Sequence, residues 1–471
     1  MPHPDTLARR FSLLQAAARS DPHPDRALRD RRLLALDRLL LDNEQAIADA
    51  IGRDFGHRSA AETRLLELFP SHEAIRHARR NLRRWMQPQA RSVSLWFQPG
   101  RAEVRHQPLG AVGIMVPWNY PIFLAAAPLA AALAAGNRAL VKMSEITPAT
   151  ASLFAELVGR YFAEDEVSVV EGDVKVAREF SQLPFDHLLF TGSTSVGRQV
   201  MRAAAENLTP VTLELGGKSP AIIGPALSPA HFARAVERII VGKCLNAGQT
   251  CIAPDYVLLP AGQEQAFIDQ ARSVVATCYP DIEKTADYST IVDQRQYARL
   301  SACLEEARMA GAKIVDLAAA AVADPLRRRL PPVVLLDAGD ELRVMQEEIF
   351  GPLLPLRPYR DLDEAIAFVN GRPRPLALYY FDNDRAAIER ILDETVCGGV
   401  TINDTILHIA QDDLPFGGVG PSGMGCYHGF AGFETFSVRK GVFRQSRLSG
   451  IGLFKPPYRG LFERLTRILL R

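Results

Sequence analysis

The stretch His187-Leu-Leu-Phe-Thr-Gly-Ser-Thr-Ser-Val-Gly197 decides the fold class. A short apolar run, typical of a buried strand, ends in a turn with two glycines, and helical spacing follows over residues 195–206. A glycine loop that opens a helix can place backbone N–H groups and the positive helix end against a pyrophosphate. The spacing is not the common G-x-G-x-x-G, however, and an ordinary strand-to-helix turn explains it equally well.

The same alternation continues on both sides of this stretch. Strand-like runs cover residues 110–116, 139–142, 167–170, 187–190 and 211–215, and helical segments cover residues 121–136, 148–162 and 195–206. A second alternating region runs from Ser219 to about Pro415, and Ser228 can cap a helix over residues 229–245. The pattern predicts an α/β protein whose parallel sheets are covered on both faces and bind ligands at the carboxyl ends of their strands.

The two ends of the chain differ from this middle region. Residues 6–86 have helical spacing with few turn signals, and residues 92–107 look like a β-hairpin around a central Pro-Gly. Residues 447–471 form a basic segment with apolar side chains at helical spacing. Such a segment can touch a membrane surface. Because it is short, we expect it to pack within a dimer or between domains instead.

Length and composition narrow the classes of function. A chain of 471 residues is too long for one compact core. Its net charge of +1 does not favour nucleic acid, so the basic run Arg76–Trp85 is interpreted as a solvated helix face. The longest apolar run, Pro121–Gly136, is shorter than the about 20 residues that span a bilayer. The six cysteines form no CxxC pair, which indicates reduced thiols, no metal site and a cytoplasmic location.

Cys251 is the candidate nucleophile. It ends the run Cys244-Leu-Asn-Ala-Gly-Gln-Thr-Cys251, where a helix gives way to a turn before the next strand. Nucleophiles are commonly placed on such loops, although a free cysteine is more often a small buried hydrophobe. The C-terminus of the preceding helix disfavours a thiolate, so a base, local amides or a bound cation would have to activate Cys251. Cys244 falls on the apolar helix face and is interpreted as packing.

Two polar residues elsewhere suit the same chemistry. Glu214, in Leu213-Glu-Leu-Gly-Gly217, lies among apolar and small residues that would raise the pKa of its carboxyl group, as a general base requires. It could instead be a structural glutamate paired with an amide or a cation. Asn119, in Pro117-Trp-Asn-Tyr-Pro121, can donate its amide to an oxyanion or can cap the helix that follows.

Further residues suit a nucleotide. Lys142 ends a strand and Glu145 follows closely. Lys142 can pair with the charge of a nucleotide and Glu145 can bind its ribose hydroxyls, or the two residues can form an ordinary surface ion pair. Glu347-Glu-Ile-Phe-Gly-Pro352 and the glycine-rich run Leu414–Gly425 are each, alone, only loop signals. The second run is so rich in glycine that its backbone must approach another segment closely.

Taken together, these motifs resemble one family. PWNYP, FTGSTSVG, LELGGKSP, NAGQTC, EEIFGP and LPFGGVGPSGMG occur in the order seen in the NAD(P)-dependent aldehyde dehydrogenase superfamily. The likeness covers essentially the whole chain and is strongest for the class 3 branch, and GVTINDT and MGCYHGF resemble coniferyl aldehyde dehydrogenase-type members. It implies a Rossmann-like cofactor domain (1–91 and 108–218), an α/β catalytic domain (219–415) and a small β flap of oligomerisation strands (92–107 and 434–446).

The resemblance also implies individual roles. Cys251 matches the nucleophile, Glu214 the general base, and Asn119 the oxyanion donor that acts with the backbone N–H of Cys251. The implied cofactor contacts are Lys142 and Glu145 at the adenosine ribose, Gly192, Ser193 and Gly197 at the phosphates, and Glu348 and Phe350 at the nicotinamide ribose. The implied lining of the substrate tunnel is Tyr120, Leu124, Ala127 and Phe416.

The activity that the resemblance implies is oxidation of an aldehyde to a carboxylic acid by a homodimer. The small Ala127 leaves room for phenylpropenyl or other aromatic aldehydes, and medium- to long-chain aliphatic aldehydes are the alternative. Glu145 should repel a 2′-phosphate, which favours NAD over NADP. Two other hypotheses are acyl transfer to coenzyme A, whose family members generally lack the Glu of LELGG, and an inactive binding protein, which the intact Cys251 and Glu214 disfavour.

Overall fold

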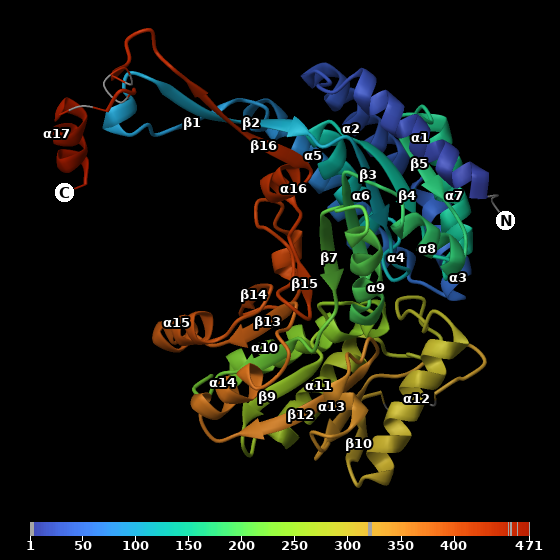
Figure 1. Ribbon diagram of the computed structural model, residues 1–471. Helices are drawn as coiled ribbons and strands as arrows, with labels where there is room; N and C mark the ends of the chain where they lie inside the picture. Colours follow the sequence, from blue (N-terminus) through green and yellow to red (C-terminus); the bar gives the residue numbers. More distant parts are fainter. Residues whose placement is uncertain (1–3, 319–322, 451, 453–454, 459, 471) are drawn as a thin grey trace.

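The computed structural model describes residues 4–318, 323–450, 452, 455–458 and 460–470, and these residues form three β-sheets (Figure 1). Two of the sheets are largely parallel, and a third, antiparallel one projects from the body of the molecule. The predicted α/β class with parallel sheets is confirmed.

The first sheet has six strands in the order β15-β7-β6-β3-β4-β5. Its strands are β3 (Ala111–Met115), β4 (Arg138–Lys142), β5 (Val167–Val170), β6 (His187–Gly192), β7 (Val211–Leu215) and β15 (Gly423–Met424). Its connecting helices are α6 (Phe123–Ala135), α7 (Pro148–Tyr161), α8 (Val174–Ser181) and α9 (Thr194–Ala205). The strand order reverses between β3 and β6, and ligands bind outside the carboxyl ends of the strands at such a point.

The second sheet has seven strands in the order β10-β11-β12-β9-β8-β13-β14. Its strands are β8 (Pro220–Ile223), β9 (Tyr256–Pro260), β10 (Lys313–Asp316), β11 (Val333–Leu336), β12 (Leu353–Tyr359), β13 (Ala377–Phe381) and β14 (Gly399–Ile402). Its helices are α10 (Pro229–Cys244), α11 (Glu264–Cys278), α12 (Gln294–Met309), α13 (Arg343–Gln346), α14 (Leu362–Asn370) and α15 (Arg385–Glu394). As predicted, Ser228 caps α10, by accepting from the backbone N–H of His231.

Helices form the N-terminal region, as its spacing predicts. They are α1 (Pro4–Ser20), α2 (Arg26–Leu41), α3 (Glu44–Phe55), α4 (Ala60–Thr63), the π-helical turn η1 (Arg64–Leu68) and α5 (Phe69–Trp85). Helices α2 and α5 pack against α6. Every residue of α6 is buried, which explains why this helix is apolar all round. Its rigid placement fixes the loop before it, which carries Asn119.

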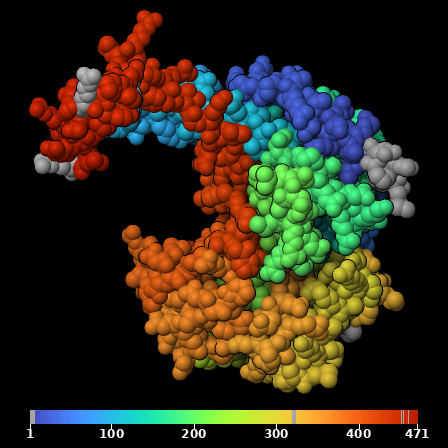
Figure 2. Space-filling model, in the orientation of Figure 1, coloured from blue at the N-terminus to red at the C-terminus, as the bar shows by residue number. Residues whose placement is uncertain are grey.

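The third sheet forms an arm that stands away from the body (Figures 1 and 2). It pairs β1 (Gln89–Arg91) and β16 (Ser437–Arg444) with the two edges of β2 (Arg101–Pro108), all antiparallel. The predicted hairpin over 92–107 is therefore wrong in its first strand. Leu95–Phe97 forms a 3₁₀ turn in which Leu95 accepts from the backbone N–H of Gln98, so these residues join no strand pairing.

The remaining elements follow β14. They are the 3₁₀ turn η4 (Leu407–Ala410), α16 (Gly429–Thr435) and α17 (Gly460–Leu469), and α17 lies near the tip of the arm (Figure 1). One strand of the first sheet, β15, comes from the glycine-rich run and lies outside the predicted range 108–218. Among the described residues, no helix is both long and apolar enough to cross a membrane.

Candidate active site

Cys251 lies on a strained loop between α10 and β9. A 3₁₀ turn, η3 (Leu245–Gly248), follows α10 directly, and Asn246 and Ala247 both adopt a left-handed φ of 52°. Left-handed backbone is unusual for residues other than glycine, and such strain clusters at functional sites. As predicted, Cys251 lies on a loop between two rigid elements, α10 and β9.

Burial and two nearby carboxyl groups act on the Cys251 thiol. Burial raises its pKa well above the usual range for cysteine, and the charges of Glu348 and Glu214 raise it further. The backbone N–H groups of Cys251 and Ile252 act in the opposite direction, because they can donate to the sulfur. A cation near the sulfur would favour the thiolate. Cys244, by contrast, is fully buried, and all six cysteines are free thiols.

Glu214 is a buried carboxyl group without a partner. It occupies the fourth position of β7, between β6 and β15, and is 2% exposed. Neither carboxylate oxygen has a hydrogen-bond partner among the described residues, and burial raises the pKa well above the usual value for glutamate. A structural glutamate would be expected to have such a partner. The glycine-rich run passes directly beside it, since Gly423 pairs with Glu214, and the predicted close backbone approach is confirmed.

Asn119 faces the cysteine loop and does not cap α6. Its side-chain nitrogen Nδ2 donates to the carbonyl oxygen of Gln249 at 3.1 Å, two residues before Cys251. One of its two amide hydrogens is thus engaged and the other can meet a second acceptor. The residue is 3% exposed, so a donor at this place acts in a poorly hydrated site.

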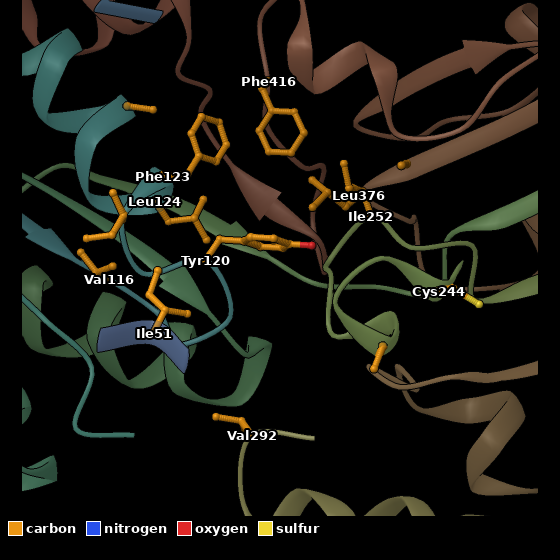
Figure 3. Packing of buried hydrophobic residues seen from close by; sticks show 14 of the residues in the cluster. Ile51, Val116, Tyr120, Phe123, Leu124, Cys244, Ile252, Val292, Leu376 and Phe416 are labelled. Atoms are coloured by element: carbon orange, nitrogen blue, oxygen red, sulfur yellow. The ribbon is translucent and has the colours of Figure 1, made fainter. Parts of the chain in front are cut away.

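A cavity of about 630 Å³ begins at Cys251 and is mostly apolar in its lining. Tyr120 and Leu124 lie on one wall and Ile252 on another, and Figure 3 shows the Tyr120 ring pointing toward Ile252. The Tyr120 hydroxyl is satisfied by Thr250 Oγ1 at 2.6 Å. We call this space the Cys251 cavity. Its other lining residues include Phe123, Val241, Leu245, Thr405, Ile406, Ile409 and Ala410, with Arg234, Glu237 and Asp404 among its charged residues.

Two predicted tunnel residues are not part of this lining. Ala127 is buried inside α6, and Phe416 is 4% exposed and stacks on the ring of His428 at 5.3 Å. Phe416 also meets Tyr427 edge to face at 6.0 Å. Both residues therefore pack behind the wall, and the structure brings Tyr120 and Leu124, but not Ala127 and Phe416, to the Cys251 cavity.

The loop at the end of β6 is open for an anion. Ser193 is the N-cap of α9 without making a side-chain capping bond, so the first amides of this helix are not occupied by its hydroxyl. Gly197 lies against the sheet, where an added Cβ would stand 2.7 Å from Leu215 Cδ2. An added Cβ at Gly192 would likewise stand 2.5 Å from Phe190 Cζ. Both glycines allow close packing, as a phosphate-binding turn requires.

A second cavity of about 490 Å³ begins at Thr194 on this helix and contains Glu348. Its floor is Gly216 and Gly217, and a Cβ at Gly216 would lie 1.9 Å from the Glu348 carboxylate. Glu348 Oε1 has no hydrogen-bond partner among the described residues, and burial raises the pKa of this group to about 8. A carboxyl group placed this way fits a ribose hydroxyl. We call this space the Glu348 cavity.

The other predicted cofactor residues flank these loops. Phe350, at a φ of 50°, packs its ring against Trp118 at a centroid distance of 5.2 Å, which joins it to the segment of Asn119. At the end of β4, Lys142 is buried and lies 3.4 Å from Glu145, which is exposed. Burial lowers the pKa of Lys142. These residues fit a dinucleotide that crosses the carboxyl ends of the first sheet.

Comparison with known proteins agrees with this geometry. The model of the aldehyde dehydrogenase family matches residues 15–442. The chain belongs to the aldehyde dehydrogenase family. It is an oxidoreductase that acts on an aldehyde, and the family uses NAD or NADP.

Individual relatives cover nearly the whole aldehyde dehydrogenase chain. A "probable coniferyl aldehyde dehydrogenase" of Pseudomonas aeruginosa is 54% identical over 455 residues, which are 97% of this chain and 94% of the relative. Aldehyde dehydrogenase family 3 member A2 of Mus musculus is 40% identical over 435 residues, covering 92% and 87%. The substrate-bound structure of Staphylococcus aureus AldH is 37% identical, superposes with a TM-score of 0.92 and covers 100% of both chains. The resemblance to class 3 and coniferyl aldehyde dehydrogenases is confirmed.

Part of this aldehyde dehydrogenase site was not predictable from motifs. Thr250 and Ile252 could have been found as neighbours of Cys251 in sequence. Val241 and Ile406 line the cavity from other elements and look like ordinary core residues in the sequence. The buried side chains of Arg58, Glu62 and Glu67 also bond to segments of the site, and nothing in the sequence distinguishes them from solvated charged residues.

Proposed function

We propose that this aldehyde dehydrogenase oxidises aromatic aldehydes of the phenylpropenyl type, such as coniferyl aldehyde, to carboxylic acids. The observation that carries the proposal is the Cys251 cavity, whose apolar walls and volume of about 630 Å³ suit a flat aromatic body with its aldehyde at Cys251. The relative named for coniferyl aldehyde supports the same substrate class.

The proposed reaction begins at Cys251. Its thiolate adds to the aldehyde carbon, and the resulting oxyanion accepts hydrogen bonds from Asn119 Nδ2 and from the backbone N–H of Cys251. NAD, when bound, supplies the acceptor for the hydride that leaves this carbon. Glu214 then takes a proton from water, which hydrolyses the thioester on Cys251 and releases the acid. Removing one oxyanion donor costs roughly 10²–10³ in rate at comparable sites.

We further propose NAD as the preferred cofactor. Lys142 and Glu145 would hold the adenosine ribose, and the exposed carboxylate of Glu145 would repel a 2′-phosphate. Ser193, Gly192 and Gly197 would cradle the phosphates, while Glu348 and Phe350 would contact the nicotinamide ribose. The unpaired Glu348 oxygen beside Gly216 supports this placement.

A second candidate substrate class is medium- to long-chain aliphatic aldehydes. The lining of the Cys251 cavity is mostly apolar, with Leu124, Val241 and Ile252 among its residues, and it would also accept an alkyl chain. Acyl transfer to coenzyme A is less well supported, because family members of that type generally lack the glutamate of LELGG, which is present here as Glu214.

One panel experiment tests the substrate proposal. We expect kcat/KM to be higher for coniferyl and cinnamyl aldehydes than for alkanals of six to twelve carbons, with the free acid as product. Each aldehyde is measured with NAD and with NADP, and Cys251→Ala serves as the blank for cofactor reduction that does not need the thiol. Clearly higher kcat/KM for the alkanals would reject the aromatic assignment, and turnover by Cys251→Ala would reject the nucleophile.

A further inference from the structure

Three ionisable side chains form a buried cluster outside every motif of the reaction, and burial raises the pKa of both of its carboxyl groups, that of Glu67 to about 7. Arg58 follows α3, Glu62 lies in α4 and Glu67 in η1. Arg58 Nε lies 3.7 Å from Glu62 Oε2, and Arg58 Nη2 lies 3.8 Å from Glu67 Oε1. The side chains of Arg58 and Glu67 are both 0% exposed. We call these three residues the buried triad.

The buried triad holds two active-site segments: Arg58 and Glu67 hold residues 119–123, and Glu62 holds the cysteine loop. Arg58 Nη1 donates to the backbone carbonyl of Asn119 at 3.0 Å, and the guanidinium carbon stands 4.9 Å from the centre of the Tyr120 ring. Glu62 Oε1 accepts from the backbone N–H of Asn246, in the cysteine loop, at 3.0 Å. Glu67 Oε2 accepts from two backbone N–H groups at the start of α6, those of residues 122 and 123, at 2.7 and 3.2 Å.

The two segments that the triad holds are also bonded to each other. Asn246 Nδ2 donates to the carbonyl oxygens of Asn119 and Gln249, both at 3.1 Å. Asn119 Nδ2 donates to the same Gln249 carbonyl. The carbonyl of Asn119 thus accepts from Arg58 on one side and from Asn246 on the other. Its peptide has little freedom to rotate, and the direction of its side chain is fixed with it.

The cost of this arrangement argues against a purely stabilising role. Taking an ion out of water costs several kcal/mol, and a buried pair often stabilises a fold no better than apolar residues would. Arg58 Nε and Nη2 have no hydrogen-bond partner among the described residues, because both carboxylates lie beyond hydrogen-bond distance. Among these residues, the hydrogen bond that the guanidinium makes is the one to Asn119.

We propose that Arg58 is a positioning residue of the reaction. It fixes the peptide of Asn119 so that the Asn119 amide meets the oxyanion formed at Cys251. The inference rests on the proposed role of Asn119. A displacement of about 1 Å in a catalytic group can cost about 10²-fold in rate, and we expect Arg58→Met to lose roughly 10- to 100-fold in the rate of Cys251 acylation.

The test is a double-variant cycle that needs no cofactor. Acylation of Cys251 by a nitrophenyl ester is followed for wild type, Arg58→Met, Asn119→Ala and the double variant. Because the two residues act as one unit in this proposal, the double variant should be no slower than Asn119→Ala alone. Arg79→Met is the matched control, since Arg79 also binds a carboxylate, Asp30 at 2.9 Å, but lies away from the cavity lining.

Two further measurements separate positioning from folding. Alkylation of Cys251 by iodoacetamide forms no oxyanion, so its rate should be unchanged in Arg58→Met. If melting shows that the methionine variant does not fold, Arg58→Lys takes its place in the cycle, because it keeps the charge and loses the planar fork. Additive losses in the double variant, or an equal loss in alkylation, would overturn the positioning role. If Asn119→Ala is acylated at the wild-type rate, Asn119 does not have its proposed function, and the inference about Arg58 is rejected with it.

Discussion

At the scale of single residues, Glu214 has the least usual environment in the site. Its carboxyl group is 2% exposed and neither oxygen has a partner among the described residues, so burial alone raises its pKa. Water activation needs the ionised form. We expect thioester hydrolysis to be slow below this raised pKa and to become faster as pH increases through it.

The pH dependence of hydrolysis can be measured separately from acylation. An acyl group is placed on Cys251, excess reagent is removed, and release of the acid is followed from pH 5 to 9. Glu214→Gln should lower the rate by about 10²–10⁴ and abolish the rise with pH. An unchanged pH profile in Glu214→Gln would show that another group is the base.

Single residues also show what the sequence could and could not predict. Cys251, Glu214 and Asn119 stand in motifs whose order identified the family. Arg58 does not, because a buried charge and a solvated one look alike in a sequence until the fold brings their partners together. Its contact with Asn119 joins positions 61 residues apart.

At the scale of elements, Gly216 in the β7–β8 connection leaves the space that the Glu348 side chain occupies. An added Cβ at Gly216 would overlap the carboxylate of Glu348, at 1.9 Å. We expect Gly216→Ala to displace Glu348 and to raise the Kd for NAD by about 5- to 100-fold, as the loss of a hydrogen bond from a buried polar group would. Isothermal titration with NAD measures this.

Gly159→Ala is the matched control for the glycine prediction. Gly159 lies in α7, and no atom comes within 4 Å of an added Cβ. It should bind NAD normally and be slightly more stable, by about 0.4–1 kcal/mol, because alanine restricts the unfolded chain. Normal NAD binding by Gly216→Ala would contradict the assignment of Glu348 to the cofactor.

Elements differed in how far the sequence determined them. Strands β3 to β7 and helices α6, α7, α9 and α10 follow from apolar spacing and were predicted with errors of a few residues at their ends. The rest of the second sheet was predicted only as a region in which strands and helices alternate. The first strand of the arm was not, because the apolar run Leu95–Phe97 has strand-like composition but forms a tight 3₁₀ turn. For a similar reason, two of the predicted tunnel residues, Ala127 and Phe416, do not line the Cys251 cavity. Apolar composition does not distinguish the wall of a cavity from the layer behind it.

At the scale of the whole molecule, the arm exposes large aromatic side chains. Trp96 is 60% exposed, Phe97 49% and Phe443 50%. Trp96 and Phe97 belong to the 3₁₀ turn Leu95–Phe97, which precedes β2, and Phe443 belongs to β16 of the arm. A patch of this kind on a projecting sheet marks an interaction surface. We propose that a second copy of the chain covers it, as the predicted homodimer requires.

The proposed dimer can be tested with surface charges on the arm. We expect Trp96→Asp combined with Phe443→Asp to give a monomer in size-exclusion chromatography with light scattering, with NAD binding retained. Leu326→Asp is the control, because Leu326 is 93% exposed but lies on a loop away from the arm. A dimer that survives both arm substitutions would place the interface elsewhere.

The Cys251 cavity and the Glu348 cavity have no lining residue in common. The Cys251 cavity depends on α6, α10 and the segment of η4, whereas the Glu348 cavity depends on the start of α9 and on α14. Substitutions that accumulate in one therefore leave the walls of the other untouched. In evolution or in the laboratory, the range of accepted aldehydes can therefore change while the proposed site of the nicotinamide ribose at Glu348 stays as it is.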